Sequence, residues 1–382
     1  MADLGPIAGS GYPLSSSLAL VWQMAERFAT PFRPSGPLAF RAQTGDNGIP
    51  QIGALAGGGP YSRHQWQPGS RFMEAFSDRL YAAIRQRATP AMVGLDPRIE
   101  MLPTPLRPEG SPNDWAAQAR AYREFCCGVV DVVAPLVPVV KPQAAFFEEL
   151  GPAGMECLEK VIRYAQSNGL LVVLDGKRND IGSTATAYAK GLLGRDGWSP
   201  WGADALTVSP YLGDDSLQPF VDVAAERSAG VFVLVKTSNP GSRVFQDLEC
   251  AGRRVYEHVA EMVETLAERT RGQCGYGAVG AVVGATYPEQ LAELRRQMPH
   301  AWLLVPGYGS QGGTAKDVAG AFDARGFGAI INNSRGILFA YREGGYAKTY
   351  GASRWQEAVE AATRRMIEEL RANTLAGRLA GP

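Results

Sequence analysis

Short runs of apolar, often β-branched residues recur along most of the chain and predict buried β-strands. Eight such runs lie at residues 91–96, 137–141, 170–175, 203–208, 231–236, 278–284, 302–307 and 328–333. Because their apolar positions are nearly continuous rather than alternating with polar ones, we expect strands that are buried on both faces, as in a parallel sheet.

The stretches between these runs carry apolar residues at helical spacing. The last stretch shows this best, with a stripe formed by Trp355, Val359, Ala362, Met366 and Leu370. A second stripe, before the sixth run, is formed by Val255, Val259, Met262 and Leu266. Repeated strand–helix units predict an α/β protein with a (β/α)8 TIM barrel. A doubly wound open sheet is the alternative, because it is built from the same units; the strand count and the placement of polar residues favour the barrel.

The first part of the chain differs from this pattern. Residues 1–72 are rich in Gly, Pro and Ser, and only residues 17–29 suggest a helix, so we expect a poorly ordered or atypical N-terminal extension. Met73 opens an amphipathic helix, and we hypothesise that translation can begin there; native protein that contains earlier residues, seen by mass spectrometry, would refute this. The barrel domain is expected over residues 73–374, followed by a C-terminal tail at 375–382.

Composition and charge narrow the functional classes. The 38 basic and 38 acidic residues balance, which argues against a broad nucleic-acid-binding surface. No apolar run approaches the length of a membrane span, and the N-terminus lacks the basic region of a secretory signal. The five cysteines form no CxxC pair. We therefore expect a cytoplasmic protein that binds a small molecule rather than nucleic acid or membrane.

Polar and charged residues stand where the predicted strands end. They are Asp96, Lys141, Asp175 with Lys177, Ser209, Lys236, Gln311 and Arg335. In a TIM barrel the working residues lie at the C-terminal ends of the strands. Because buried charges are costly unless they are paired, their repeated position at the ends of apolar strands predicts a polar site.

The segment LLVVLDGKRNDIGSTA carries the most specific signal. Side chains two apart on a strand share a face, so Asp175 and Lys177 are expected to point together into the barrel mouth. Asp180 follows in the loop, close enough to join a charge cluster. A lysine between carboxylates stays protonated, which suits proton donation better than Schiff-base formation. The alternative is a salt-bridged lysine in an ordinary surface turn.

Two glycine-containing segments predict an anion site. VPGYGSQGG at residues 305–313 follows the seventh run, and NNSRGI at residues 332–337 follows the eighth and offers Arg335 as a forked donor. The loops after strands seven and eight form the usual phosphate pocket of a TIM barrel. Asp96 could accept hydrogen bonds from a sugar, and Thr237 or Ser238 could bind a polar base. The three histidines do not cluster, so we expect no metal site.

These motifs together resemble the orotidine 5'-phosphate decarboxylase family, whose hallmark D-x-K-x-x-D-I-x-x-T is matched by DGKRNDIGSTA. Asp96, Lys141, PGYGSQGG and the SRG after the last strand occur in the family's order, and TVSPYLG and TSNPG are similar to its longer bacterial branch. The resemblance covers residues 73–374. It implies decarboxylation of orotidine 5'-phosphate (OMP) to UMP, the last step of de novo pyrimidine synthesis, without metal or organic cofactor.

The resemblance also implies a role for individual residues. Lys177 would protonate C6 of the pyrimidine, Asp175 would lie beside the substrate carboxylate, and Lys141 with Asp175 would hold Lys177 in a charge network. Asp180 and Thr184 would reach across the interface of a homodimer into the neighbouring site. The implied substrate contacts are Asp96 and Lys141 for ribose hydroxyls, Gln311 and Arg335 for the phosphate, and Thr237 or Ser238 for the base.

Three other functions remain as alternatives. Hexulose-phosphate synthases and ketogulonate-phosphate decarboxylases resemble the chain in D-x-K-x-x-D, but they need magnesium and place an acid at the second strand end, where this chain has Lys141. A Schiff-base aldolase would use Lys177 as an amine. A non-catalytic barrel would bind a nucleotide without turning it over.

Overall fold

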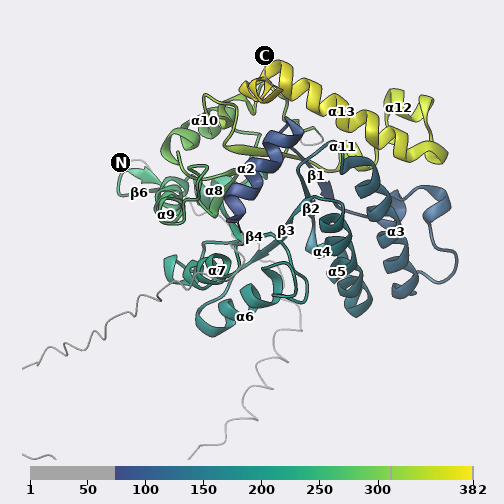
Figure 1. Cartoon of the computed structure of the whole chain (residues 1–382), viewed down its shortest axis with the longest axis horizontal. Helices are drawn as coiled ribbons and strands as arrows, with labels where there is room; N and C mark the ends of the chain where they lie inside the picture. Colours follow the sequence, from purple (N-terminus) through teal and green to yellow (C-terminus); the bar gives the residue numbers. More distant parts are fainter. Residues whose placement is uncertain (1–73, 310–311, 381–382) are drawn as a thin grey trace, which may run out of the picture. The chain divides into compact units, whose positions relative to one another are not determined.

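The computed structural model describes residues 74–309 and 312–380, and it shows a closed barrel of eight parallel strands (Figure 1). In chain order the strands are β1 (Ala91–Leu95), β2 (Val139–Pro142), β3 (Leu171–Arg178), β4 (Ala205–Val208), β5 (Gly230–Lys236), β8 (Val279–Val283), β9 (Leu303–Val305) and β10 (Ala329–Asn333). Each overlaps one of the predicted runs, and β3 extends three residues beyond its run, to Arg178. Because β1 pairs with both β2 and β10, the sheet closes, which confirms the TIM barrel and excludes the open sheet.

Helices surround the barrel and connect its strands. They are α2 (Phe76–Arg87), α3 (Trp115–Val133), α4 (Ala144–Glu148), α5 (Gly151–Ser167), α6 (Gly182–Leu192), α7 (Asp214–Glu226), α8 (Arg243–Gln246), α9 (Val255–Arg269), α10 (Pro288–Gln297), α11 (Arg335–Leu338), α12 (Gly344–Thr349) and α13 (Trp355–Asn373). A short antiparallel hairpin, β6 (Glu249–Cys250) and β7 (Arg253–Arg254), lies between α8 and α9. In the described part between β9 and β10 the connection holds only a 3-10 turn at Ala319–Ala321.

Helix α2 closes the N-terminal end of the barrel. Its Phe76 is buried against Phe232 of β5, with the two ring centroids 6.0 Å apart. A Cβ atom at Gly230 would lie 2.2 Å from the Phe76 ring, so only glycine lets the helix approach β5 this closely. Leu80 and Ile84 continue the plug into the interior. Since this end is filled with apolar side chains, a polar site is left to the C-terminal ends of the strands.

The apolar stripes predicted from the sequence agree with the buried faces of the helices better for α13 than for α9. In α13 the residues Val359, Ala362, Met366 and Leu370 are buried as predicted, and Trp355 is half-buried. The prediction for α9 was partly wrong, because the buried residues are Tyr256, Ala260, Val263, Leu266 and Ala267. The apolar face of α9 is broad: Val259 and Met262 are partly buried and pack against the core, while the small Ala260 and Ala267 are fully buried against it.

The ends of the chain differ in how far their predictions can be tested. The N-terminal extension, its helix at 17–29 and the start at Met73 lie outside the described residues. At the other end, Leu375–Ala380 forms a 3-10 helix in which Ala376 is buried and Arg378 donates to the Ala324 carbonyl, so these residues pack on the barrel. Across the described ranges no helix is both long and apolar enough to cross a bilayer.

Candidate active site

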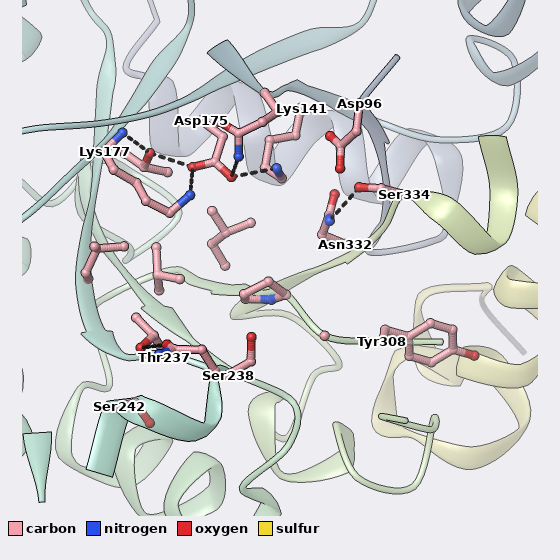
Figure 2. A pocket seen from close by; sticks show the side chains of 18 of the residues that line it. Asp96, Lys141, Asp175, Lys177, Thr237, Ser238, Ser242, Tyr308, Asn332 and Ser334 are labelled. Atoms are coloured by element: carbon pink, nitrogen blue, oxygen red, sulfur yellow. Dashed lines mark hydrogen bonds and ion pairs between the residues drawn. The ribbon is translucent and has the colours of Figure 1, made fainter. Parts of the chain in front are cut away.

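The C-terminal ends of the strands line a cavity of about 620 Å³ (Figure 2). Its walls include most of the residues predicted from the sequence, namely Asp96, Lys141, Asp175, Lys177, Thr237, Ser238 and Arg335. They come from the ends of β1, β2 and β3 and from the segments after β5 and β10. The barrel therefore gathers side chains that are up to 239 residues apart, Asp96 to Arg335, around one space.

A chain of three charges forms one wall of this cavity. The Lys141 Nζ atom lies 2.7 Å from Asp175 Oδ2, and the Lys177 Nζ atom lies 2.6 Å from Asp175 Oδ1 (Figure 2). One carboxylate thus bridges two ammonium groups, each on its own oxygen. The Asp175 and Lys141 side chains are almost fully buried, whereas the Lys177 side chain is 47% exposed. The buried pair can therefore fix the position of an ammonium that a ligand in the cavity can reach.

Two further side chains that sequence reasoning missed complete the shell of Asp175. The Thr207 hydroxyl of β4 donates to Oδ1 at 2.9 Å, and the Gln143 amide donates to Oδ2 at 3.1 Å. Four side-chain donors therefore hold one carboxylate in place. The sequence contains only a weak indication of these two contacts. Gln143 stands two residues after Lys141, and Thr207 is the polar position inside a buried strand.

The strand that carries Asp175 and Lys177 is irregular at this point. The pairing of β3 with β4 shifts register between Leu174 and Arg178, and Lys177 has φ = 44°, in the left-handed region. The Lys177 amide donates to the Thr207 hydroxyl at 2.9 Å instead of continuing the ladder. Asp175 and Lys177 do point together as their spacing predicts, but a bulge rather than a regular strand places them so. Left-handed backbone at a lysine is strained, and such strain gathers at functional sites.

The same contacts shift the pKa values of the buried pair. Burial alone would raise the pKa of Asp175, but the charges of Lys141 and Lys177 and their hydrogen bonds outweigh it and hold that pKa well below the usual carboxyl range. Burial would lower the pKa of Lys141, yet the charges of Asp175 and Asp96 raise it above the ordinary lysine value. Both groups are therefore charged at neutral pH.

Asp180 and Thr184 do not belong to the cavity of their own chain. Asp180 accepts a hydrogen bond from the Ile181 amide at 2.8 Å, and no ion pair joins it to Lys177 within the described residues. Thr184 is exposed on α6. The expectation that Asp180 joins the charge cluster is therefore not met within one chain. Asp180 is half-buried and Thr184 exposed, both outside this cavity, so the role across an interface that the sequence resemblance implies stays a prediction.

Unsatisfied acceptors mark the part of the cavity next to Lys141. Asp96 Oδ1 and Asn332 Oδ1 are buried and have no hydrogen-bond partner. The charge of Asp96 acts on Lys141, and the Asn332 amide donates to Ser334 Oγ at 3.3 Å (Figure 2). Buried acceptors without partners are costly, so a ligand that brings hydroxyl groups would satisfy them. Asn332 and Ser334 were not identified from the sequence.

The opposite rim of the cavity carries the predicted anion-binding elements. Arg335 lines it and forms no ion pair with any carboxylate among the described residues. Gly307 also lines the cavity and has φ = 99°, which brings the backbone of the loop after β9 to its edge without a side chain. Gln311, the other predicted phosphate ligand, lies outside the described residues.

Thr237 and Ser238 lie across the cavity from the charged chain (Figure 2). The Thr237 hydroxyl donates to Asn239 Oδ1 at 2.7 Å and accepts from Gln246 Nε2 at 2.9 Å. Gln246 and the neighbouring Phe245 of α8 also line the cavity, although neither was predicted from the sequence. Lys236 and Ser209, two of the polar residues noted at the predicted strand ends, do not line the cavity.

The fold and the site define a (β/α)8-barrel protein with a Lys–Asp–Lys chain at one side of its mouth and an arginine-containing rim at the other. Residues 90–350 match the family described as Orotidine 5'-phosphate decarboxylase / HUMPS. The chain belongs to this family.

Individual relatives agree with this assignment. An orotidine 5'-phosphate decarboxylase of Rhodopirellula baltica is 57% identical over 301 residues, which are 78% of this chain and all of the relative. One of Deinococcus radiodurans is 45% identical over 270 residues, 70% of this chain and 89% of the relative. The solved OMP decarboxylase of Leishmania donovani is 35% identical, with a TM-score of 0.60 that covers 79% of this chain and 99% of that structure.

Proposed function

We propose that this cavity decarboxylates orotidine 5'-phosphate to UMP with Lys177 as the proton donor. The reaction itself is that of the family to which the chain belongs, so the protein is a carboxy-lyase of pyrimidine biosynthesis. The observation that carries the role of Lys177 is its ion pair with a carboxylate that Lys141, Thr207 and Gln143 also hold.

The chemistry follows from this arrangement. The bond between C6 and the substrate carboxylate breaks, CO2 leaves, and the electron pair stays on C6, where it has little delocalisation. The Lys177 ammonium supplies nearby positive charge and then its proton, so that a C6–H bond forms and a neutral amine remains. Asp175 lies beside the departing carboxylate. Because Lys177 is half-exposed, solvent can return its proton after product release.

The other residues that line the cavity would bind the ribose, the phosphate and the base of the substrate. Asp96 and Lys141 would meet the ribose hydroxyls, which supplies the donors that the unpartnered Asp96 oxygen lacks. Arg335, with Gln311, would bind the phosphate. Either Thr237 or Ser238 would contact the base. Binding energy from phosphate and ribose, which do not react, can be used to organise the reacting end.

We expect the working form to be a homodimer in which Asp180 and Thr184 enter the partner's site. Lys177 has only one carboxylate partner within the described residues, and Asp180 does not line the cavity of its own chain. Large apolar side chains are exposed in the segments after β3, β4 and β5, namely Ile181, Tyr188, Tyr211, Leu212, Val244 and Phe245. These strands are neighbours in the barrel, so a second copy could cover this apolar surface. All five cysteines are free thiols, which fits the expected cytoplasmic location.

The magnesium-dependent members of the wider family are the nearest alternative, and a direct assay separates them. In this chain the second strand ends in Lys141, which binds Asp175 and so occupies the place of a metal-binding acid. We expect ultraviolet monitoring to show loss of OMP at the same rate with and without EDTA. Activity that chelation abolishes and magnesium restores would favour the alternative.

Arg335→Ala is expected to weaken binding of the phosphorylated substrate. One charge-assisted contact to the phosphate would be lost, which should raise KM by about 10- to 100-fold with a smaller change in kcat. Arg364→Ala is the matched control, because Arg364 pairs with Glu360 on the exposed face of α13. Unchanged KM and kcat in Arg335→Ala would contradict the assignment.

Mixing two defective variants tests the shared site. Lys177→Ala and Asp180→Asn each damage every site of their own homodimer. A mixed dimer instead has one site with its own Lys177 and the partner copy's intact Asp180. Random exchange of subunits should therefore make about one quarter of all sites complete. Activity of the mixture above that of either variant, measured after unfolding and refolding together, is the expected result; a simple average would contradict it.

A further inference from the structure

Lys236 ends β5, yet its side chain lies outside the cavity and is fully buried. Its ammonium binds the Asp247 carboxylate just after α8, and it lies over the Tyr287 ring at 4.6 Å and the Tyr256 ring at 5.5 Å. The pairing of β5 with β8 shifts register between Leu234 and Lys236, which turns the lysine away from the mouth. An ammonium in such a place requires a partner, because an unpaired buried charge is costly.

The segment between Lys236 and Asp247 forms part of the cavity wall. Gln246 accepts from the Thr237 amide at 2.9 Å and donates to the Thr237 hydroxyl at 2.9 Å. These two hydrogen bonds join the beginning and the end of the segment next to the cavity. Phe245 and Gln246 line the cavity together with Thr237 and Ser238. The ion pair therefore lies directly behind the residues that face the expected base.

This geometry leaves the segment between Lys236 and Asp247 little freedom. Lys236 is fixed by its pairing with Val283 of β8 and by the two tyrosine rings, so the ammonium cannot follow a moving partner. The Asp247 side chain is 30% exposed and could turn to solvent only by leaving that ammonium unpaired. The low-energy position of Asp247 thus fixes Gln246, whose amide still has a donor and an acceptor site for a ligand after its contacts with Thr237.

We propose that Lys236 and Asp247 are positioning residues that hold α8 against the base end of the site and thereby set its affinity for the pyrimidine. The inference rests on the proposed function, since it assigns the Thr237 side of the cavity to the base. The apolar side chains Leu234, Val282 and Leu304 line the same cavity and suit a flat ring. A displaced α8 would move Gln246 and Phe245 away from the base while the ribose and phosphate contacts remain.

Two ligands separate positioning from general stability. UMP carries the base, whereas ribose 5-phosphate carries only the parts bound by Asp96, Lys141 and Arg335. Lys236→Met keeps the length and packing of the side chain between the tyrosine rings and frees an aspartate that water can reach. We expect calorimetry to show UMP binding weakened by about tenfold or more, with ribose 5-phosphate changed by less than about twofold. Asp247→Asn, which can still accept a hydrogen bond, should give a smaller loss in the same direction.

Control variants and the wild type make the outcome decisive. Lys160→Met, at an exposed ion pair with Glu156 on α5, should change neither affinity. Equal losses for both ligands in Lys236→Met, or no loss for UMP, would overturn the proposal. If Lys236→Met does not fold, the same comparison on Asp247→Asn decides. Wild-type protein that neither binds UMP nor consumes OMP would instead refute the proposed function, before any variant is compared.

Discussion

Replacing Lys177 with alanine is expected to abolish nearly all turnover of OMP while leaving the fold intact. The variant loses both the positive charge beside C6 and the proton that C6 must receive, which together should lower kcat by about 10⁴-fold or more. The fold should survive because Lys177 is half-exposed and Asp175 keeps Lys141, Thr207 and Gln143 as partners. Ultraviolet assay of OMP loss and a thermal melt measure the two effects.

Two further variants sharpen this test. Lys177→Arg retains a positive charge, but a guanidinium hardly gives up a proton, so it should also be nearly inactive. Lys160→Ala, at an exposed ion pair, should retain full activity. A Lys177→Ala protein that folds and retains a substantial rate would contradict the proton-donor role, and an active Lys177→Arg would show that charge alone suffices.

The barrel could be predicted because its strands are buried on both faces and therefore appear in the sequence as apolar runs. The ends of strands were predictable in the same way, since a charge that closes such a run is costly unless it serves a site. This reasoning found Asp96, Lys141 and Asp175, which do line the cavity. It also selected Lys236, which does not, because the shift in register after Leu234 is a property of the pairing with β8 and not of the run itself.

The partners of Asp175 could not be predicted for a related reason. Gln143 and Thr207 are each 32 residues from Asp175 in the sequence, and only the registers of the strands decide which of their atoms meet. The wall formed by Phe245 and Gln246 depends likewise on the fold of an irregular segment after β5. Local spacing predicted that Asp175 and Lys177 point together, but not the bulge that places them.

Asp175→Asn is expected to remove activity and also to destabilise the protein. The change takes away the charge that binds both lysines and leaves Lys141, whose side chain is only 4% exposed, without an ionic partner. Removing one member of a buried ion pair typically costs about 3–5 kcal/mol, so we expect the free energy of unfolding to fall by that order in chemical denaturation. Asp222→Asn, at an exposed position of α7, is the control and should change little.

The dependence of stability on pH gives an independent check of the same group. The pKa of Asp175 is lower in the folded protein than in the unfolded chain, so its contribution is present above the unfolded value of 3.8 and is lost as the pH falls through the folded value. The pKa of Lys141 is raised, so its contribution is complete below the unfolded value of 10.5 and is lost as the pH rises through the folded one. In Asp175→Asn the free energy of unfolding should therefore fall less steeply as the pH decreases into the acid range. The loss of stability relative to the wild type should be largest at neutral pH.

A double variant separates the structural role of Asp175 from its catalytic role. Lys141→Met in the Asp175→Asn background removes the unpaired buried ammonium, and replacement of both partners of a buried pair costs far less than loss of one. We expect the double variant to regain much of the lost free energy of unfolding and none of the activity, because Lys177 still lacks the carboxylate that holds it. Recovery of turnover along with stability would show that Asp175 serves the fold alone, and the assignment of a catalytic Asp175–Lys177 pair would then be wrong.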